Sequence, residues 1–396
     1  MSTTNSQALS EAGAGSPEWH QSLADGAPGI ALPHIEAAHA GTTGWKLVHQ
    51  YATAMTRAPV HAHPDHTNLF RGAPAVAYTL HLAGHPAYRG ALATLDHSIN
   101  TLIQHRLTTA HQRINTGQLP HAGEYDLING LTGLGAYLLH RHDDHELLRD
   151  ILRYLVRLTH PIRPDGETLP GWWAAASPDR RRTSRWNGGH AGFGMAHGAA
   201  GPLALLSATM LRGITVTGHT DAIDTITAWY DQWQTGTGQQ ACWPEVIDRH
   251  ELRTGTAAHP GPHRPSWCYG TPGITRAQQL AGQATNDQHR THTAEQALLG
   301  CLTDDTQLAQ ITDAGLCHGW AGLAHTAQYA AAEATNDALA AAAHDATDRM
   351  RRHLHQHGHP TDPGLLEGAA GVALVDNVDH TAASAGPRWD TFLLAG

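Results

Sequence analysis

A repeated pattern runs along the chain, in which a glycine turn leads into an almost entirely apolar stretch of Ala and Leu. A stretch that is apolar nearly all round predicts a helix buried on most sides. Glycine before such a helix allows close backbone approach and leaves free N–H groups at the helix start. The pattern starts at Phe70 and has leading glycines at Gly72, Gly130, Gly198, Gly270, Gly319 and Gly368.

Amphipathic segments lie between the apolar stretches, for example at 147–160 and 220–234. Their apolar positions recur with helical spacing, so each predicts a helix with one buried face. Apolar and amphipathic helices in alternation indicate an inner ring enclosed by an outer ring, and strand signals are scarce. The predicted fold class is therefore all-α, an α/α toroid.

The domain organisation follows from the same pattern. Residues 1–20 are polar and small, which predicts a flexible lead-in, and 21–396 are expected to form a single toroid domain. Long connections rich in Gly, Pro, Trp or Arg interrupt the regular spacing at 160–194, 235–266 and 356–364. Long loops in a compact domain are usually functional or disordered. The first two lead into motif-bearing turns and are expected to line the mouth of the toroid.

Composition narrows the function. The formal charge of −10 argues against nucleic acid as the main partner. Four cysteines in 396 residues are not a disulfide framework and fit a reducing compartment. The N-terminus lacks the basic start and apolar region of a signal peptide, and no apolar run is long enough to span a membrane. We therefore expect a cytoplasmic protein.

Two of the repeats carry metal-binding side chains. "SWCYGTPG" contains Cys268, and "GLCHGWAG" contains Cys317 with His318 beside it. Two thiolates and one imidazole suit Zn²⁺ and leave a fourth position for water or substrate, as in catalytic zinc sites. The alternative is that both cysteines are buried core residues. Their shared place in the repeat, which Cys242 and Cys301 lack, favours the metal.

Two further turns carry candidates for proton transfer. His197 in "GMAHGAAG" and Asp126 in "GEYDLINGLTG" precede inner helices at the mouth. Histidine suits proton transfer near neutral pH, and a nearby carboxylate sets its tautomer or donates a proton itself. The competing interpretations are structural, because Asp126 could cap a helix and His197 could bind a backbone carbonyl.

Three further features lie close to these motifs. Arg264, four residues before Cys268, could stabilise a developing oxyanion or stay solvated. Tyr269 could hydrogen-bond within the site or only pack. The basic residues Arg180, Arg181, Arg182 and Arg185 suggest a solvated face or a grip for an acidic peptide.

Several motifs together give the chain a family resemblance from about Phe70 to its end. "WCYGTPG" at 267–273, "GLCHG" at 315–319, "MAHGAAG" at 195–201 and "YDLINGLTG" at 125–133 resemble the zinc and active-site motifs of the lanthionine synthetase C-like (LanC) cyclases. The ending "LLEGAAGVAL" followed by "RWDTFLL" is also similar. Asn129 stands where an acidic residue is expected, Ala73 and Pro74 make the first repeat less regular, and no small inserted β domain is recognised.

The resemblance implies a toroid of about seven helical hairpins around one Zn²⁺. Cys268, Cys317 and His318 would be the metal ligands. His197, Asp126 and Arg264 would be active-site residues, with Tyr269 beside them. The partner would be a dehydrated precursor peptide made by a separate dehydratase, because no dehydrating region precedes the repeats. An export complex is a further candidate partner.

The implied reaction adds a peptide Cys thiol to dehydroalanine or dehydrobutyrine and forms a lanthionine or methyllanthionine ring. In this mechanism Zn²⁺ activates the thiol, Arg264 stabilises the enolate, and His197 or Asp126 protonates Cα. The alternatives are addition of a small thiol such as glutathione, and an inactive peptide-binding scaffold. A toroid glycosidase would need paired carboxylates, and Asp126 alone occupies a motif position.

Overall fold

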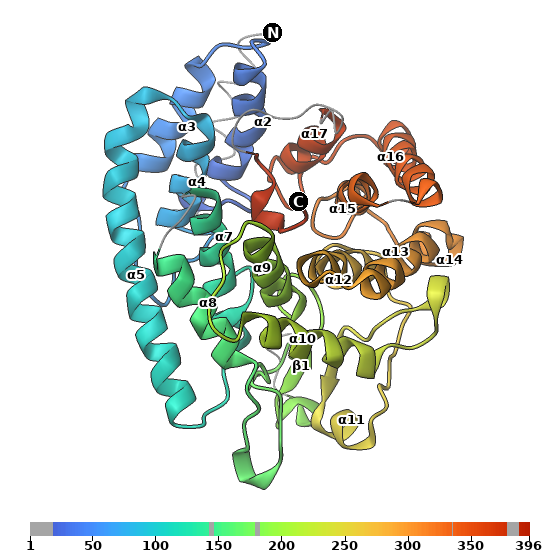
Figure 1. Ribbon diagram of the computed structural model, residues 1–396. Coiled ribbons are helices and arrows are strands. Elements are labelled where there is room, and N and C mark those ends of the chain that lie inside the picture. Colours follow the sequence, from blue (N-terminus) through green and yellow to red (C-terminus); the bar gives the residue numbers. More distant parts are fainter. Residues whose placement is uncertain (1–18, 142–145, 179–182, 335, 378–387) are drawn as a thin grey trace.

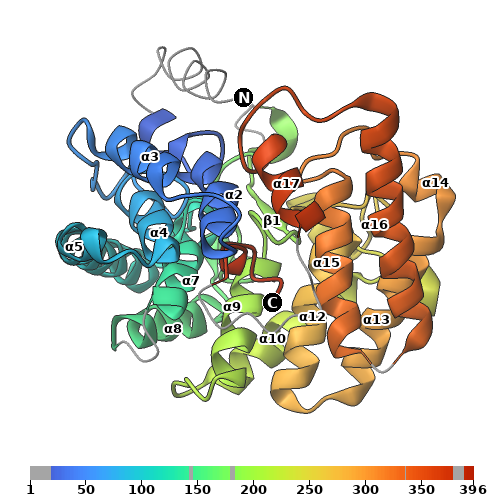
Figure 2. The ribbon, with the colours of Figure 1, turned by 90° about the horizontal axis from the view of Figure 1, so that it is seen from above.

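The computed structural model describes residues 19–141, 146–178, 183–334, 336–377 and 388–396. Within them the apolar repeats form seven inner helices, each in contact with the next, and the last contacts the first. Figures 1 and 2 show this closed ring. The inner helices are α2 (Ala27–His39), α4 (Ala73–Ala83), α7 (Leu131–Arg141), α9 (Ala200–Leu211), α12 (Thr271–Thr285), α15 (Trp320–Glu333) and α17 (Ala369–Asn377).

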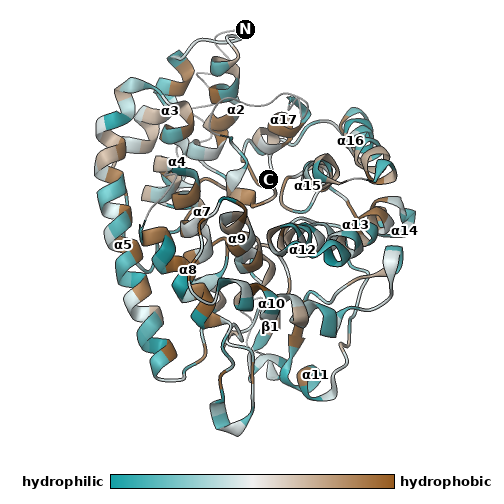
Figure 3. Ribbon diagram, in the orientation of Figure 1, coloured by the Kyte–Doolittle hydropathy of each residue, from teal (hydrophilic) through white to brown (hydrophobic). Residues whose placement is uncertain are grey.

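Amphipathic helices pack outside this ring, each against the inner helix that precedes it. Hydrophilic residues gather on outer helices such as α5, α13 and α16 (Figure 3). The α/α toroid predicted from the sequence is confirmed. The outer helices of the described part of the chain are α3 (Lys46–Thr56), α5 (Arg89–Asn115), α8 (Glu146–Leu158), α10 (His219–Trp233), α13 (Gln288–Thr303) and α16 (Asp337–His357).

One inner helix, α2, lies before Phe70, where the pattern predicted from the sequence starts. Helix α2 follows Gly26 and has the same second glycine, Gly29, three residues later. Most of its side chains are buried, as in the other inner helices. Pro33, inside the helix, together with the His and Glu residues of the segment, obscures the apolar run in the sequence. The repeat therefore begins before Phe70.

Short elements join the two rings. They include helices α6 (Ala122–Tyr125), α11 (Arg249–Thr254) and α14 (Asp305–Leu308). Strands β1 (His190–Gly192) and β2 (Val246–Asp248) pair antiparallel, with Ala191 opposite Ile247. They belong to the first two long connections, so this pairing joins those loops. No described helix has the length and apolar character needed to cross a bilayer.

The C-terminal residues 388–396 enter the interior of the ring, where Figures 1 and 2 show the end of the chain surrounded by inner helices. Trp389, Phe392 and Leu393 are buried there, and residues 391–393 contact α7. Phe392 packs edge-on against Phe70 and Tyr78. The C-terminal segment therefore fills the centre of the toroid. Of the predicted lead-in, residues 1–18 lie outside the described residues.

The second glycine of the repeat is required by packing. A Cβ atom on Gly322 would lie 2.0 Å from the carbonyl oxygen of Leu316, and one on Gly273 would lie 2.0 Å from that of Trp267. Both oxygens belong to the turn before the helix. Only glycine lets the first turn of the inner helix rest on this backbone.

We predict that Gly322→Ala lowers the free energy of unfolding by about 2 kcal/mol or more, because the new methyl group overlaps a fixed carbonyl. Gly90, on exposed α5, has no atom within 4 Å of an added Cβ. Gly90→Ala should therefore raise stability by about 0.5–1 kcal/mol through helix propensity. Urea unfolding of both variants measures the difference. If both variants changed the free energy of unfolding by the same amount, the packing role of Gly322 would be contradicted.

Candidate active site

A five-residue turn precedes every inner helix and ends at its leading glycine. We call these segments the mouth turns. They comprise residues 22–26, 68–72, 126–130, 194–198, 266–270, 315–319 and 364–368. Most carry a backbone hydrogen bond from the fifth residue to the first, such as Gly270 N to Ser266 O at 3.1 Å. The turns therefore share one local geometry.

Backbone hydrogen bonds also join neighbouring mouth turns through their third residues. The amide of Ala196 donates to the carbonyl of Cys268 (3.0 Å), and the amide of Cys268 donates to that of Cys317 (3.3 Å). The Cys317 amide donates to Leu366 (2.8 Å), and Leu366 donates to Ala24 (3.0 Å). This series, the backbone belt, places the third residues of successive turns side by side.

The belt brings together the three predicted metal ligands. Cys268 and Cys317 are third residues of adjacent turns, and His318 is the fourth residue of the second turn. Their ligand atoms lie within 4.8 Å of one another. Cys268 is buried, whereas Cys317 and His318 are partly exposed at the mouth. Among the described residues this is the only cluster of at least three Cys, His or acidic side chains with that spacing.

The electrostatics of the cluster suit a soft cation. Hydrogen bonding by Cys317, and then by His318 and Ser266, lowers the pKa of the Cys268 thiol to about 5 although burial opposes this. The hydrogen bond to Cys268 in turn raises the pKa of His318. These shifts favour the thiolate form of Cys268 and the protonated form of His318. A metal that binds there must displace protons, which is typical of Zn²⁺ at thiolate and imidazole ligands.

His197 and Asp126 form a second polar pair at the mouth. The Nδ1 atom of His197 lies 2.6 Å from Oδ2 of Asp126. The other oxygen, Oδ1, accepts hydrogen bonds from the backbone amides of Asn129 (2.5 Å) and Gly130 (3.0 Å). Asp126 is fully buried, whereas the His197 side chain is 36% exposed. Asp126 thus both caps its turn and orients His197, so the two interpretations of this residue are compatible.

Tyr269 lies between the cysteine cluster and the histidine pair. It is the fourth residue of its turn, and its ring centroid is 6.1 Å from that of His197. Burial, together with the nearby negative charge of Cys268, raises the pKa of the Tyr269 phenol above its usual value. The hydroxyl therefore stays protonated and can donate a hydrogen bond at neutral pH.

Arg264 is partly buried in the loop that leads into the turn of Cys268. Its charge lowers the pKa of His318 and of Cys317, which opposes the larger effect of Cys268 on both groups. The guanidinium is therefore close enough to act on the cluster. Within the described part of the chain, Arg264 has no ion pair or side-chain hydrogen bond to hold it elsewhere.

Only one of the four arginines of the basic run is among the described residues. Arg180, Arg181 and Arg182 lie outside the described residues. Arg185 contacts Asp248 at 3.0 Å and Glu251 at 3.1 Å, and its guanidinium lies over the ring of Trp186. Arg185 is therefore an exposed residue that also ties the first long connection to the second.

Two residues that the sequence pattern did not identify support the site. Ser266 Oγ accepts hydrogen bonds from the amides of Tyr269 (3.3 Å) and Gly270 (2.9 Å), as Asp126 does in its own turn. Ser266 and Asp126 share the first position of their turns, and this equivalence in the sequence could have revealed Ser266. Arg106 comes from outer helix α5 and donates to the carbonyl of Asn129 at 2.6 Å. Nothing in the local sequence pattern marks Arg106.

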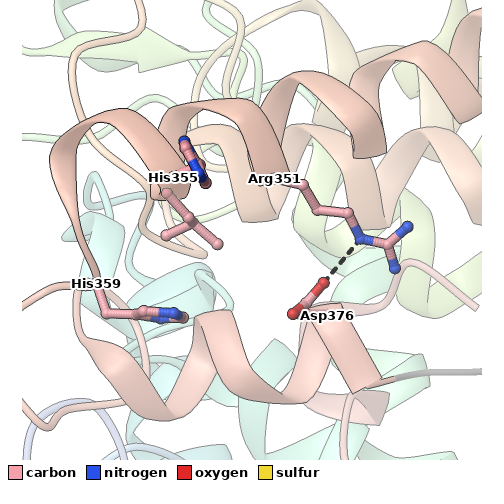
Figure 4. A pocket seen from close by; sticks show the side chains of 5 residues that line it. Arg351, His355, His359 and Asp376 are labelled. Carbon is pink, nitrogen blue, oxygen red and sulfur yellow. Dashed lines mark hydrogen bonds and ion pairs between the residues drawn. The ribbon is translucent and has the colours of Figure 1, made fainter.

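A separate hollow lies between α16 and α17 (Figure 4). It measures about 280 Å³, and an ion pair of 2.9 Å between Arg351 and Asp376 forms one side of it. Leu354, His355 and His359 complete its lining. None of the residues predicted to carry chemistry lines this hollow, so the mouth turns remain the candidate site.

The fold and the site define an α/α toroid with a cluster of two thiols and an imidazole at its mouth. The sequence profile described as "Lanthionine synthetase C-like protein" matches residues 17–393, and the chain belongs to that family. It is 23% identical to "Nisin biosynthesis protein NisC" from Lactococcus lactis subsp. lactis over 317 residues, which cover 78% of this chain and 72% of that protein.

A solved structure shares the fold. The structure named "Nisin cyclase" superposes with a TM-score of 0.78 at 21% identity. The match covers 96% of this chain and 93% of that one. The likeness in fold therefore extends over nearly the whole of both chains.

We predict that Asp126→Asn keeps the fold but changes the tautomer of His197. Asn caps a turn about as well as Asp, so the free energy of unfolding should stay within about 1 kcal/mol. An amide that uses its oxygen for the cap presents N–H₂ to Nδ1, which then must accept. Nitrogen-15 chemical shifts of the His197 ring report the change. A His197 ring that still carries its proton on Nδ1 would contradict the orienting role.

Proposed function

We propose that the chain is a zinc-dependent lanthionine cyclase. It would join Cys thiols to dehydroalanine or dehydrobutyrine in a ribosomally made, dehydrated precursor peptide. Membership of the lanthionine synthetase C-like family supports the ring-forming reaction. The observation that carries the proposal is that the ligand atoms of Cys268, Cys317 and His318 lie within 4.8 Å of one another at the mouth. The mouth turn next to that of Cys268 carries His197, which is paired with Asp126.

The donor set fits Zn²⁺ held by the two thiolates and the imidazole. When bound, the cation supplies the positive charge that lowers the pKa of a substrate thiol. Asp313 and Glu367 flank His318, at 3.7 Å from Nε2 and 3.9 Å from Nδ1. Such carboxylates can orient the imidazole of a metal ligand. Two thiolate ligands would keep the centre electron-rich and a substrate sulfur nucleophilic.

The chain's own residues supply the remaining steps. The substrate thiol releases its proton to water, its sulfur forms a bond to the β-carbon, and the π electrons of the double bond move to an enolate. Arg264 provides positive charge for that enolate. His197, whose Nδ1 is held by Asp126, presents Nε2 for transfer of a proton to Cα. The proton that His197 gives to Cα is then replaced from water. Full burial of Asp126 favours His197 as the group that reaches the substrate.

The product distinguishes this reaction from its alternatives. A purified enzyme is incubated with a synthetic peptide that contains one Cys and one dehydroalanine. Ring closure consumes the thiol without changing the mass of the peptide. Addition of glutathione would increase the mass, and an inactive scaffold would leave the thiol free for alkylation. We expect loss of the thiol at constant mass.

We predict one Zn²⁺ per chain, lost in the double variant Cys268→Ala, Cys317→Ala. The matched control is Cys301→Ala, which removes a buried cysteine of α13 that is not part of the cluster. Zinc affinity should fall as the pH is lowered, because His318, with its raised pKa, must release its proton to bind. Metal analysis and chelator competition measure both effects. Full zinc content in the double variant would exclude this ligand set.

We predict that His197→Ala retains zinc and slows ring formation by about 10²–10⁴-fold, the usual contribution of a general acid or base. His97→Ala, on the exposed face of α5, serves as the control for loss of a histidine. Thiol consumption on the dehydroalanine peptide gives the rate. A zinc-replete His197→Ala enzyme with the wild-type rate would assign His197 a structural role only.

A further inference from the structure

The C-terminal segment 388–396 is bonded to the inner ring through its backbone. Its carbonyl oxygens accept hydrogen bonds from buried side chains of the ring. Tyr78 Oη donates to Trp389 (2.8 Å), and Arg276 Nε donates to Ala395 (2.5 Å). Trp267 Nε1 donates to Leu393 (2.9 Å). These donors come from α4, α12 and the mouth turn 266–270, so the segment links distant parts of the ring.

Asp390 anchors the segment by its charge. Its carboxylate lies 2.9 Å from Nε2 of His325 and 3.1 Å from Nε of Arg388, and it accepts a hydrogen bond from Tyr329 (2.6 Å). Burial alone would raise the pKa of Asp390, but His325 and Arg388 together hold it well below its usual range. These contacts therefore favour the charged form of Asp390.

Trp267 connects this anchor to the metal cluster. It directly precedes Cys268, and its side chain is only 1% exposed. Leu393, whose carbonyl its indole contacts, is 126 residues away in the chain. On the mouth side, the backbone belt fixes the amide and carbonyl of Cys268. The turn is thus held from the mouth by the belt and from the interior by the C-terminal segment.

We propose that the C-terminal segment positions the metal ligand Cys268 through the Trp267–Leu393 hydrogen bond. Trp267 is then a positioning residue, and the last residues of the chain complete the metal site. The inference rests on the proposed metal site and adds a long-range support to it. Groups that orient metal ligands from behind commonly change metal affinity by about 10–100-fold.

The test compares two tryptophan-to-phenylalanine variants. Trp267→Phe keeps an aromatic ring and removes the N–H group. Trp243→Phe is the matched control, because its buried indole donates to the carbonyl of Tyr230 at the same distance of 2.9 Å outside the metal cluster. Both variants leave one buried carbonyl without its donor, so both should lose similar stability in urea.

We predict that Zn²⁺ affinity, measured by chelator competition, falls about 10–100-fold in Trp267→Phe and stays at the wild-type value in Trp243→Phe. The sulfur-to-cobalt absorption of the Co²⁺-substituted protein should change in Trp267→Phe and stay unchanged in Trp243→Phe. Equal zinc affinity of the two variants would overturn the proposal. A wild-type protein that binds no zinc would instead overturn the proposed function.

A third variant tests the segment itself. Asp390→Asn leaves Trp267 intact and weakens the anchor, so it should also lower zinc affinity and change the cobalt spectrum. If Asp390→Asn loses stability with unchanged zinc affinity, the C-terminal segment has no positioning role. This variant also decides the question if Trp267→Phe does not fold.

Discussion

The hydrogen bonds between neighbouring mouth turns are the constraint on which the site depends. In five of the turns the third residue is linked to the third residue of a neighbouring turn, through hydrogen bonds such as Cys268 N to Cys317 O. A metal site needs ligands placed to within fractions of an ångström, and loops by themselves rarely provide this. Here backbone hydrogen bonds hold the turns of Cys268 and Cys317 side by side. The glycines make it possible, because a side chain at Gly273 or Gly322 would separate helix and turn.

The sequence predicted the ring wherever a glycine pair and an uninterrupted apolar run occur together. It missed α2, because Pro33 and several polar residues interrupt the run after Gly26. The candidate site was predictable for a related reason, since Cys268 and Cys317 occupy equivalent positions of one repeat. Because every repeat has the same backbone geometry, equivalent sequence positions lie at equivalent places in the ring. Two motifs 49 residues apart could therefore be assigned to one centre.

Other features could not be predicted, because they depend on contacts between distant elements. Arg106 reaches the turn of Asp126 from an outer helix, and Trp267 meets Leu393 across 126 residues. Neither contact has a periodic signal. The double role of Asp126 was also beyond the sequence, because one carboxylate oxygen serves the backbone and the other serves His197. The sequence could present these roles only as alternatives.

The order of the mouth turns has a consequence for the chemistry that the rim presents. The turns with Asp126, His197, Cys268 and Cys317 are consecutive, while the remaining turns present Ala24, Phe70 and Leu366 at the third position. The residues proposed to carry the chemistry therefore lie on consecutive turns, and an odd number of units gives the rim no twofold axis. A chain lying across such a rim meets different chemistry at its two ends. The two halves of the rim therefore differ in chemistry, although their turns share one backbone geometry.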